Sequence, residues 1–237
     1  MAAIIVNLEC ITNMHVGNGD VNYNIIDNEV ERDVVTGYPT INSSGVKGAL
    51  REYFVKNKVE KADIDKIFGN ENGGELKFLN ADMVAIPVRA SAGSEAFYYV
   101  SVEKALETQK NNCRFFLKVE EKFEEVKITE NREAEGIPLS KAVSFMGKEI
   151  NLLSDEEFRK ISLPVLARNK LNDGKSVNLW YEEVVPHKSL FAFVVLAEDS
   201  AKETLDLFKK TIDGKIVQFG GNASIGYGLC KVSVKEG

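Results

Sequence analysis

The feature that most limits how this chain can fold is a strand–helix–strand pattern near each end. Near the N-terminus the segments are a β-branched strand over residues 4–11, an amphipathic helix over 44–54 and a strand pair over 75–88. Near the C-terminus they are a buried strand over residues 190–196, a helix from Ser200, and strands over 215–219 and 226–234. Two such units predict an α+β domain with a ferredoxin-like sheet, helices on one face, and β insertions. No Pro-, Gly- or Ser-rich linker divides the chain, so we expect residues 1–237 to form a single domain.

The middle of the chain is predicted from shorter patterns. The expected elements are a strand over residues 96–100, a helical turn or two over 103–109, a charged edge hairpin over 111–136 and a mostly helical segment over 141–159. Farther on, Asp173-Gly174 separates two apolar runs. An Asp-Gly pair in that setting is a strong β-hairpin signal.

Residues 14–42 fit neither a helical nor a strand period, and we refer to them as the acidic loop. Structureless loops longer than about 12–15 residues are uncommon in compact domains and are usually functional or disordered. Apolar residues argue against disorder here, because disordered segments lack them. They are Tyr23, Ile25, Ile26, Val30, Val34, Val35, Tyr38 and Ile41.

The acidic loop is followed by a basic helix start. Its acids are Asp20, Asp27, Glu29, Glu31 and Asp33, against a single Arg32. The helix then opens with Lys47 and Arg51, after possible N-cap side chains at Asn42, Ser43 and Ser44. This arrangement suits a polyanion held at the helix end, with a divalent cation between carboxylate and phosphate. The alternative is a solvated surface loop beside a capped helix.

Composition excludes several classes of protein. The chain has three cysteines, Cys10, Cys113 and Cys230, without metal-ligand spacing, and its two histidines are His15 and His187, so a zinc cluster is not expected. We expect buried free thiols and a cytoplasmic location, with neither a signal peptide nor a membrane span.

Charge is unevenly distributed. The net charge of −6 argues against a free-standing nucleic-acid binder. However, residues 158–181 hold five bases and one acid, whereas residues 120–135 hold seven acids and three bases. The sequence therefore predicts a basic groove on one side and an acidic face on the other.

A glycine-rich loop, GGNASIGYG, lies near the C-terminus. Such a loop can present N–H groups to phosphate, or it can be a tight β-bend. It lacks the spacing of a P-loop or of a dinucleotide site. Ser44-x-x-Lys47 is similar to an acyl-transfer motif, but the other elements of that fold are missing. Trp180-Tyr181 suits strand packing, or base stacking on a protruding hairpin.

Several blocks together resemble one family. They are HVGNG, IIDNEVERDVVTGYPTINSSGVKGALR, PVRASAG, LPVLARNKL, NLWYEEVVP and GGNASIGYGL, in this order from residue 15 to residue 229. They resemble the repeated backbone subunit of type III CRISPR effectors, and most closely the type III-B (Cmr) member of the RAMP superfamily. Asn42 and Gly45 depart from the family pattern, and the chain is shorter than many relatives.

The resemblance implies an RRM-like core, a catalytic loop over residues 14–42 and a protruding thumb hairpin over residues 163–183. It implies a head-to-tail filament along a CRISPR RNA, together with other Cmr effector subunits, and cleavage of complementary target RNA at regular intervals. By position, the cleavage aspartate is Asp27, and His15 occupies the family's HxGxG histidine position. The implied RNA-binding residues are Ser43, Ser44, Lys47, Arg51, Arg89, Arg168, Lys170, Gly220, Gly221, Asn222 and Gly226.

The implied reaction is attack of a target-RNA 2′-hydroxyl on the adjacent phosphate. A carboxylate with an ordinary pKa near ~3.9 is a weak general base at neutral pH. We therefore expect Asp27 to bind Mg²⁺ or to orient the hydroxyl. His15 is the second catalytic candidate, although we favour a structural role for it. Weaker candidates are Asp20, Asp33 and Glu182. The alternatives are a non-catalytic scaffold that binds guide RNA and a stand-alone RNA-processing endonuclease.

Overall fold

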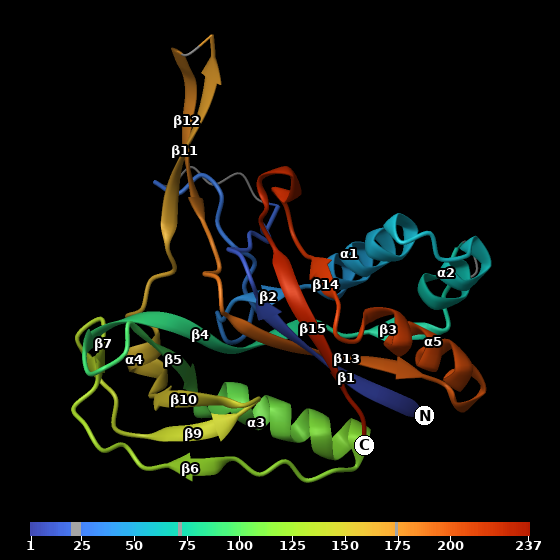
Figure 1. Ribbon diagram of the computed structural model, residues 1–237, viewed down its shortest axis with the longest axis horizontal. Helices are drawn as coiled ribbons and strands as arrows, with labels where there is room; N and C mark the ends of the chain where they lie inside the picture. The colour runs from blue at the N-terminus through green and yellow to red at the C-terminus, as the bar shows by residue number, and fades with distance from the viewer. Residues whose placement is uncertain (20–24, 71–72, 174) are drawn as a thin grey trace.

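The computed structural model of the chain describes residues 1–19, 25–70, 73–173 and 175–237, and a four-stranded antiparallel sheet forms its centre (Figure 1). In spatial order the strands are β15 (Leu229–Lys235), β1 (Ala2–Cys10), β13 (Leu190–Ala197) and β4 (Ala81–Ala92). Helix α1 (Ser43–Lys56) lies between β1 and β4 in the chain, and α5 (Lys202–Ile212) lies between β13 and β15. Each helix thus connects two parallel strands that have one antiparallel strand between them. This is the split β-α-β arrangement that the sequence predicts.

The sheet extends beyond this core on both sides. Past β4 come β5 (Phe97–Val102), β10 (Lys148–Leu153), β9 (Ala142–Phe145) and β6 (Glu124–Val126), and past β15 comes β14 (Ile216–Gln218). Short strands pair at its margins: β2 (Thr40–Ile41), β3 (Leu76–Phe78), β7 (Glu133–Ala134) and β8 (Ile137–Pro138). The other helices are α2 (Lys61–Phe68), α3 (Glu103–Asn112), a π-helical turn (Cys113–Leu117), α4 (Asp155–Phe158) and 3₁₀ turns at Asp199–Ala201 and Ala223–Ile225.

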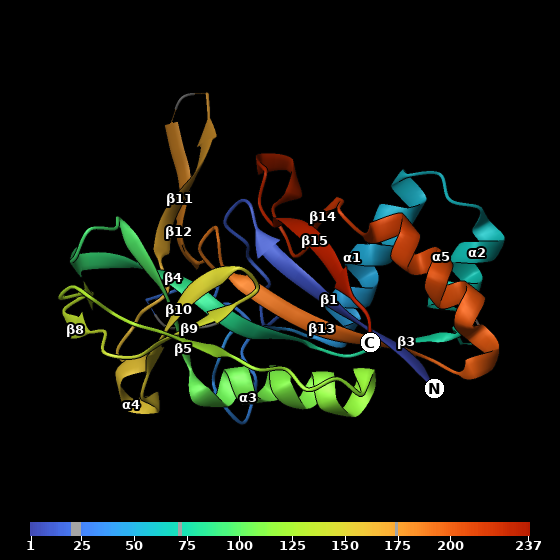
Figure 2. The same cartoon turned by 60° about the horizontal axis from the view of Figure 1, so that its bottom comes forward.

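Helices cover both faces of the sheet, which corrects the prediction of helices on one face. Every residue of β13 is buried, so neither of its faces can be left to water. Phe54 of α1, Phe68 of α2 and Phe208 of α5 pack together on one face. Leu106 of α3 belongs to a second apolar cluster on the other face. In Figure 2, α3 accordingly lies below the sheet, away from α1, α2 and α5.

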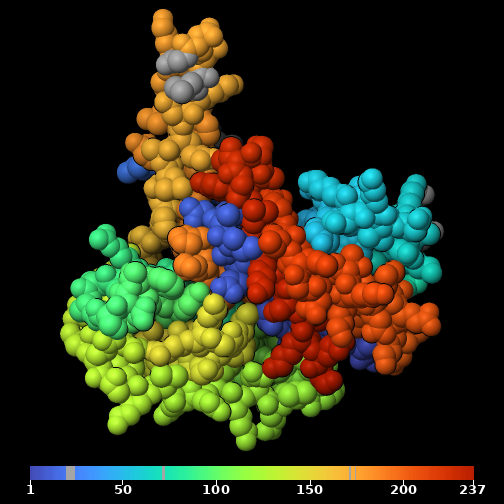
Figure 3. Space-filling model, in the orientation of Figure 1, coloured from blue at the N-terminus to red at the C-terminus, as the bar shows by residue number. Residues whose placement is uncertain are grey.

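The hairpin predicted from Asp173-Gly174 is confirmed. Strands β11 (Val165–Asn172) and β12 (Lys175–Glu183) form a separate two-stranded sheet, which we call the thumb hairpin. Asp173 has the left-handed φ of +48° that such a turn requires. Figure 3 shows the hairpin (orange) projecting well beyond the rest of the surface. Gly174 lies outside the described residues.

Two predictions for the middle of the chain are wrong. Residues 141–159 form β9, β10 and the single turn α4, not a mostly helical segment. Met146 and Gly147 both have positive φ, +52° and +69°, so they make a two-residue hairpin turn that the sequence analysis overlooked. Residues 111–136 do not form one edge hairpin, because they continue α3 through the π-helical turn before β6 reaches the edge. No helix in the described parts of the chain is long and apolar enough to span a membrane.

Candidate active site

The acidic loop runs beside the second strand of the thumb hairpin. Asn28 forms a parallel bridge with Glu182 at the base of β12. The backbone N–H groups of Asp27 and Asn28 donate to the carbonyl oxygen of Tyr181 at 3.0 and 3.2 Å. The N–H of Tyr181 donates in turn to Asp27 Oδ2 at 2.8 Å. Both the loop backbone and the carboxylate of Asp27 are therefore fixed to the backbone of the hairpin.

The Asp27 side chain is fixed but still exposed to solvent. Across the described residues, hydrogen bonding uses only one of its two carboxylate oxygens. The second oxygen remains available to a cation or to a hydroxyl group. A carboxylate in this position suits either role that the sequence analysis assigned to Asp27.

The loop is ordered around one buried acid, Glu183. The carboxylate of Glu183 accepts from the Val30 N–H at 3.1 Å and pairs with Arg32 at 2.5 Å. Arg32 is the only base of the loop, and Glu183 is 6% exposed. Hydrogen bonds to charged groups contribute about 1.5–3 kcal/mol each, so this pair explains much of the loop's order.

The apolar residues of the acidic loop differ in burial, and Ile26 is intermediate. Val30, Tyr38 and Ile41 are buried, as the prediction of an ordered loop requires. Ile25, Val34 and Val35 are 88–97% exposed and do not attach the loop to the core, contrary to prediction. Tyr23 lies outside the described residues.

His15 occupies a structural position. Its side chain is buried, and Nδ1 donates to the Glu183 carbonyl oxygen at 2.7 Å. Its own carbonyl oxygen accepts from the Gly221 N–H at 2.8 Å. His15 thereby connects the acidic loop to the thumb hairpin and to the glycine-rich loop. This burial agrees with the structural role that we favoured for His15.

The glycine-rich loop is a tight bend that packs on the acidic loop. A Cβ on Gly220 would lie 2.3 Å from the carbonyl oxygen of His15, and one on Gly228 would lie 1.8 Å from that of Phe219. Gly226 also has positive φ, but nothing lies within 4 Å of its Cβ position. Close backbone approach within the chain therefore explains Gly220 and Gly228, and Gly226 is free to face a ligand.

A buried carboxylate connects the thumb hairpin to the glycine-rich loop. Glu182 accepts from Asn222 Nδ2 at 2.8 Å and lies 3.5 Å from Arg168 Nε. The Arg168 guanidinium also lies over the ring of Tyr227, 5.0 Å from its centroid. Glu182 is 4% exposed, so it does not face a substrate as a catalytic acid would. Two predicted RNA-binding residues, Arg168 and Asn222, thus hold the site together.

The start of α1 is capped from another segment. Ser43 is the first helical residue, and its N–H donates to Asn80 Oδ1 at 2.8 Å. No side-chain cap comes from Asn42, Ser43 or Ser44, which corrects that prediction. Ser44 is exposed, and Lys47 has no hydrogen-bond or ion-pair partner anywhere in the described ranges. Both remain available to bind an anion.

The remaining predicted bases are dispersed. Arg51 is turned toward α2, where it donates to the Gly69 carbonyl oxygen at 2.7 Å and pairs with Asp65 at 3.4 Å. Lys170 is exposed on the thumb hairpin, and Arg89 is exposed on β4 opposite Phe97. The structure does not gather these bases into one cluster.

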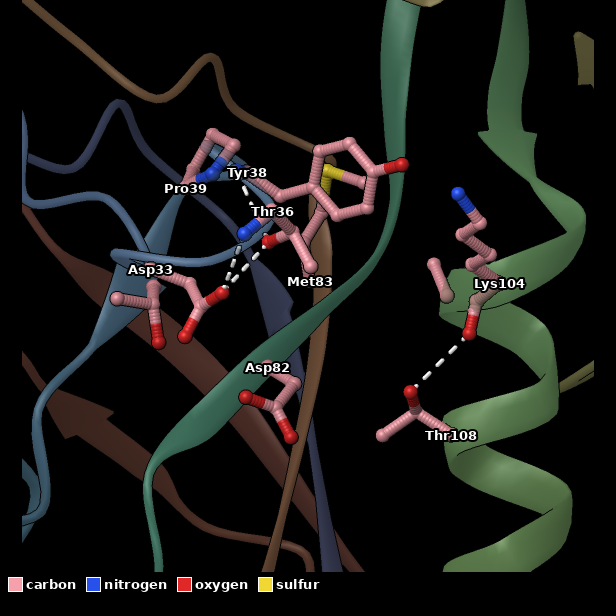
Figure 4. A pocket seen from close by; sticks show the side chains of 10 residues that line it. Asp33, Thr36, Tyr38, Pro39, Asp82, Met83, Lys104 and Thr108 are labelled. Carbon is pink, nitrogen blue, oxygen red and sulfur yellow. Dashed lines mark hydrogen bonds between the residues drawn. The ribbon is translucent and has the colours of Figure 1, made fainter. Parts of the chain in front are cut away.

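Asp33 belongs to a different feature, a cavity of about 190 Å³ between the acidic loop and α3 (Figure 4). Its carboxylate accepts from Thr36 and Val35, and the Thr36 N–H holds the pKa of Asp33 below its usual range. Burial, followed by the charge of Asp33, raises the pKa of Asp82 in this cavity to about 6. Asp82 was not among the predicted site residues, because an acid in an apolar strand has no motif to identify it. Asp20, the other acidic candidate, lies outside the described residues.

Among the described residues, no group of three or more metal-ligating side chains converges. A substrate-bound magnesium ion does not need one, because Mg²⁺ is usually held by one or two carboxylates together with phosphate and water. The exposed carboxylate of Asp27 fits that requirement, whereas the buried Glu182 and Glu183 already have protein partners.

Sequence comparisons identify one family and two similar proteins. Residues 7–231 match the RAMP superfamily. A CRISPR system Cmr endoribonuclease, Cmr4, from Pyrococcus furiosus is 29% identical over 288 residues, covering 100% of this chain and 97% of the relative. A CMR subunit Cmr4 from Saccharolobus solfataricus is 32% identical over 112 residues, covering 44% of this chain and 36% of the relative.

Solved structures show the same fold. The type III-B Cmr-beta complex bound to cognate target RNA contains a chain with a TM-score of 0.80 and 24% identity, covering 99% of this chain and 97% of that one. Oligomeric Cmr4 from Pyrococcus furiosus gives a TM-score of 0.76 at 24% identity, and the match covers 100% of this chain and 99% of that chain. The motif resemblance, the strand order and the nearly full-length family match agree: this chain belongs to the RAMP superfamily.

Proposed function

We propose that this chain is the backbone subunit of a type III-B CRISPR effector and that it cleaves target RNA complementary to the guide. Copies would bind the CRISPR RNA in a head-to-tail filament in the cytoplasm, together with other effector subunits. The observation that carries the proposal is the exposed Asp27 carboxylate, fixed by Tyr181 at the base of a protruding hairpin. A relative named as an endoribonuclease and a related complex bound to target RNA support it.

RNA binding would use the features that remain unpaired. Ser44 lies in the first turn of α1, where backbone N–H groups and the helix dipole favour a phosphate, and Lys47 follows directly after that turn. Lys170 extends the positive charge along the thumb hairpin. Contacts of this kind position a backbone without reading bases, and pairing with the guide would supply sequence specificity.

In the proposed reaction a 2′-oxygen of target RNA attacks the adjacent phosphorus and the bond to the 5′-oxygen breaks. The products are a 2′,3′-cyclic phosphate and a 5′-hydroxyl, and DNA would not be cleaved because it lacks the attacking oxygen. The hairpin would hold the RNA so that Asp27 orients the hydroxyl, and positioning of this kind can supply much of the rate. Asp27, together with phosphate oxygens, would hold Mg²⁺, which supplies positive charge to the phosphate when bound.

One observation favours the scaffold alternative. Asp27 Oδ2 already accepts a structural hydrogen bond from Tyr181, so the residue would be needed even if it only tethered the loop. A substitution by alanine alone would confuse the two roles. Asparagine separates them, because its amide oxygen can still accept from the Tyr181 N–H while the negative charge is lost.

The test compares Asp27→Asn and Asp27→Ala with the wild type in the assembled effector complex. Guide-directed binding of a target RNA and its cleavage ladder are measured separately. Binding retained and cleavage lost in both variants supports the proposed role. Cleavage retained by Asp27→Asn would leave Asp27 as a tether and favour the scaffold.

A further inference from the structure

One face of the thumb hairpin carries several exposed apolar side chains, beside the polar Asn169 and, at its base, the buried Glu183. Tyr181 lies opposite Ala167 and Leu179 lies opposite Asn169, so Tyr181 and Leu179 point to the same face. Val165, two residues before Ala167, shares that face. The exposed fractions are 41% for Val165, 57% for Leu179 and 40% for Tyr181. An aromatic ring and two aliphatic side chains thus form a strip along the hairpin that reaches its base.

The other face of the hairpin has a different chemistry. Arg168 lies opposite Trp180, and Lys170 lies opposite Asn178. Both bases therefore point away from the face that carries Tyr181. Arg168 on that side is paired with Glu182, so a nucleic-acid strand meeting the hairpin would find the exposed charge of Lys170 on one side and the apolar strip on the other.

Tyr181 is also the residue to which Asp27 is fixed. Its N–H donates to the Asp27 carboxylate, and its carbonyl oxygen accepts from the N–H groups of Asp27 and Asn28. All three hydrogen bonds use the Tyr181 backbone, so the ring takes no part in them. The ring belongs to the same residue whose backbone N–H binds the Asp27 carboxylate, and it remains partly exposed to solvent.

We propose that the Tyr181 ring stacks on a nucleobase next to the scissile phosphate and so acts as a positioning residue for cleavage. The inference rests on the proposed function. Unpaired RNA bases commonly stack on aromatic side chains, and this contact tolerates any sequence because every base has a π-face. A nuclease that is directed by guide pairing must accept any base at the cut, and stacking meets this requirement.

A protein partner fits this strip less well. Two strands present a strip only two side chains wide, whereas specific protein interfaces bury about 800 Å² on each partner. The strip also ends at Asp27, where an RNA substrate is expected and a partner would cover the carboxylate.

The test follows the design of a double-mutant cycle, in which one change is Tyr181→Ala and the other is an abasic ribonucleotide in the target RNA. The abasic residue keeps its 2′-hydroxyl and is placed on either side of one cut. Single-turnover cleavage at that cut is measured in the assembled complex, with neighbouring cuts as internal references. Stacking on one base affects binding by about 5- to 150-fold, so we expect each single change to slow the cut within that range. The double change should slow it hardly more than either alone.

Two variants serve as controls. Tyr181→Phe keeps the ring and should retain the dependence on the base. Val55→Ala removes an aliphatic side chain of similar exposure, 57%, from the end of α1, away from the hairpin, and should cleave as the wild type does.

A second readout does not require cleavage. In a target that carries a 2′-deoxy residue at the cut, 2-aminopurine is placed at successive positions and its fluorescence is measured. The wild type should quench one position per copy of the subunit, and Tyr181→Ala should not. The proposal would be overturned if Tyr181→Ala slowed cleavage equally with and without the base. It would also be overturned if Tyr181→Ala reduced assembly of the complex, which would indicate a protein interface. Failure of the proposed function would appear separately, as cleavage by Asp27→Asn with the quenching unchanged.

Discussion

Replacing Gly220 by alanine should destabilise the protein much more than replacing Gly226. Both glycines have a left-handed φ, +76° and +81°, and such a backbone costs a non-glycine residue about 1–2 kcal/mol. A Cβ on Gly220 would lie 2.3 Å from the His15 carbonyl oxygen, whereas Gly226 has open space. The difference between the variants therefore isolates the contact between the two loops.

The magnitude follows from what that contact contains. Moving Gly220 away from His15 breaks the 2.8 Å hydrogen bond that the His15 carbonyl oxygen accepts from the Gly221 N–H. His15 is buried, and a buried acceptor left without a partner costs about 1–3 kcal/mol. We expect Gly220→Ala to lose about 2 kcal/mol more stability than Gly226→Ala. For a chain of this length each kcal/mol lowers the melting temperature by about 2–4 °C, so the two variants should differ by about 4–8 °C.

Thermal and urea unfolding of the full chain, measured on both variants together, is the assay. Equal melting temperatures would refute the reasoning, because they would show that the glycine-rich loop does not depend on close approach to His15. If Gly226→Ala loses only the about 1–2 kcal/mol expected from its left-handed φ but binds RNA more weakly, the ligand-facing role of the loop would be placed at Gly226.

Two other predictions concern stability. Asn80→Ala should lose about 1 kcal/mol by urea unfolding, because it removes the side chain that caps Ser43, whereas Asn42→Ala should lose little since its side chain makes no cap. Asp82→Asn tests the raised pKa of about 6. As pH rises from about 4 to 6 the folded state binds more protons than the unfolded state at Asp82, so the wild type loses stability across this window and does not regain it above. The asparagine variant should be more stable than wild type by about 2 kcal/mol at pH 7–8, with no gain below pH 4, and a gain that does not vary with pH would contradict this.

Much of the core could be predicted because its signal is local. A run rich in β-branched residues identifies β1, the uniformly apolar run identifies β13, and Asp173-Gly174 identifies the thumb hairpin. The helical prediction for residues 141–159 was wrong because Met146-Gly147 forms a hairpin turn of the primed type without the usual Asn or Asp. Helices on both faces were also missed, although the absence of polar positions in β13 already implies two covered faces.

The site was less predictable because its contacts join distant segments. The motif resemblance identified Asp27, but its partner Tyr181 lies 154 positions farther along the chain. The Arg32–Glu183 pair spans 151 positions. The sequence held one local indication of this ion pair. Two adjacent acids, Glu182 and Glu183, occur in a strand whose other residues are mostly apolar or aromatic.

The roles of the predicted bases changed for the same reason. Arg51 and Arg168 fit an RNA-binding pattern in the sequence, yet each has an acidic partner in the fold, Asp65 and Glu182. An isolated basic residue in a sequence shows its charge but not what neutralises it. Lys47 has no such partner in the described parts of the chain, so we expect it to be a stronger phosphate ligand than Arg51 or Arg168.

The proposed attack by the 2′-oxygen is tested most directly by placing one 2′-deoxy residue in a target RNA bound by the assembled complex and measuring cleavage. The residue is placed at a single cut site, and the product ends at every cut are mapped. We predict that this cut alone disappears, while the other cuts persist with 2′,3′-cyclic phosphate and 5′-hydroxyl ends. Cleavage that continues at the substituted site, or products with 5′-phosphate ends, would contradict attack by the 2′-oxygen beside Asp27.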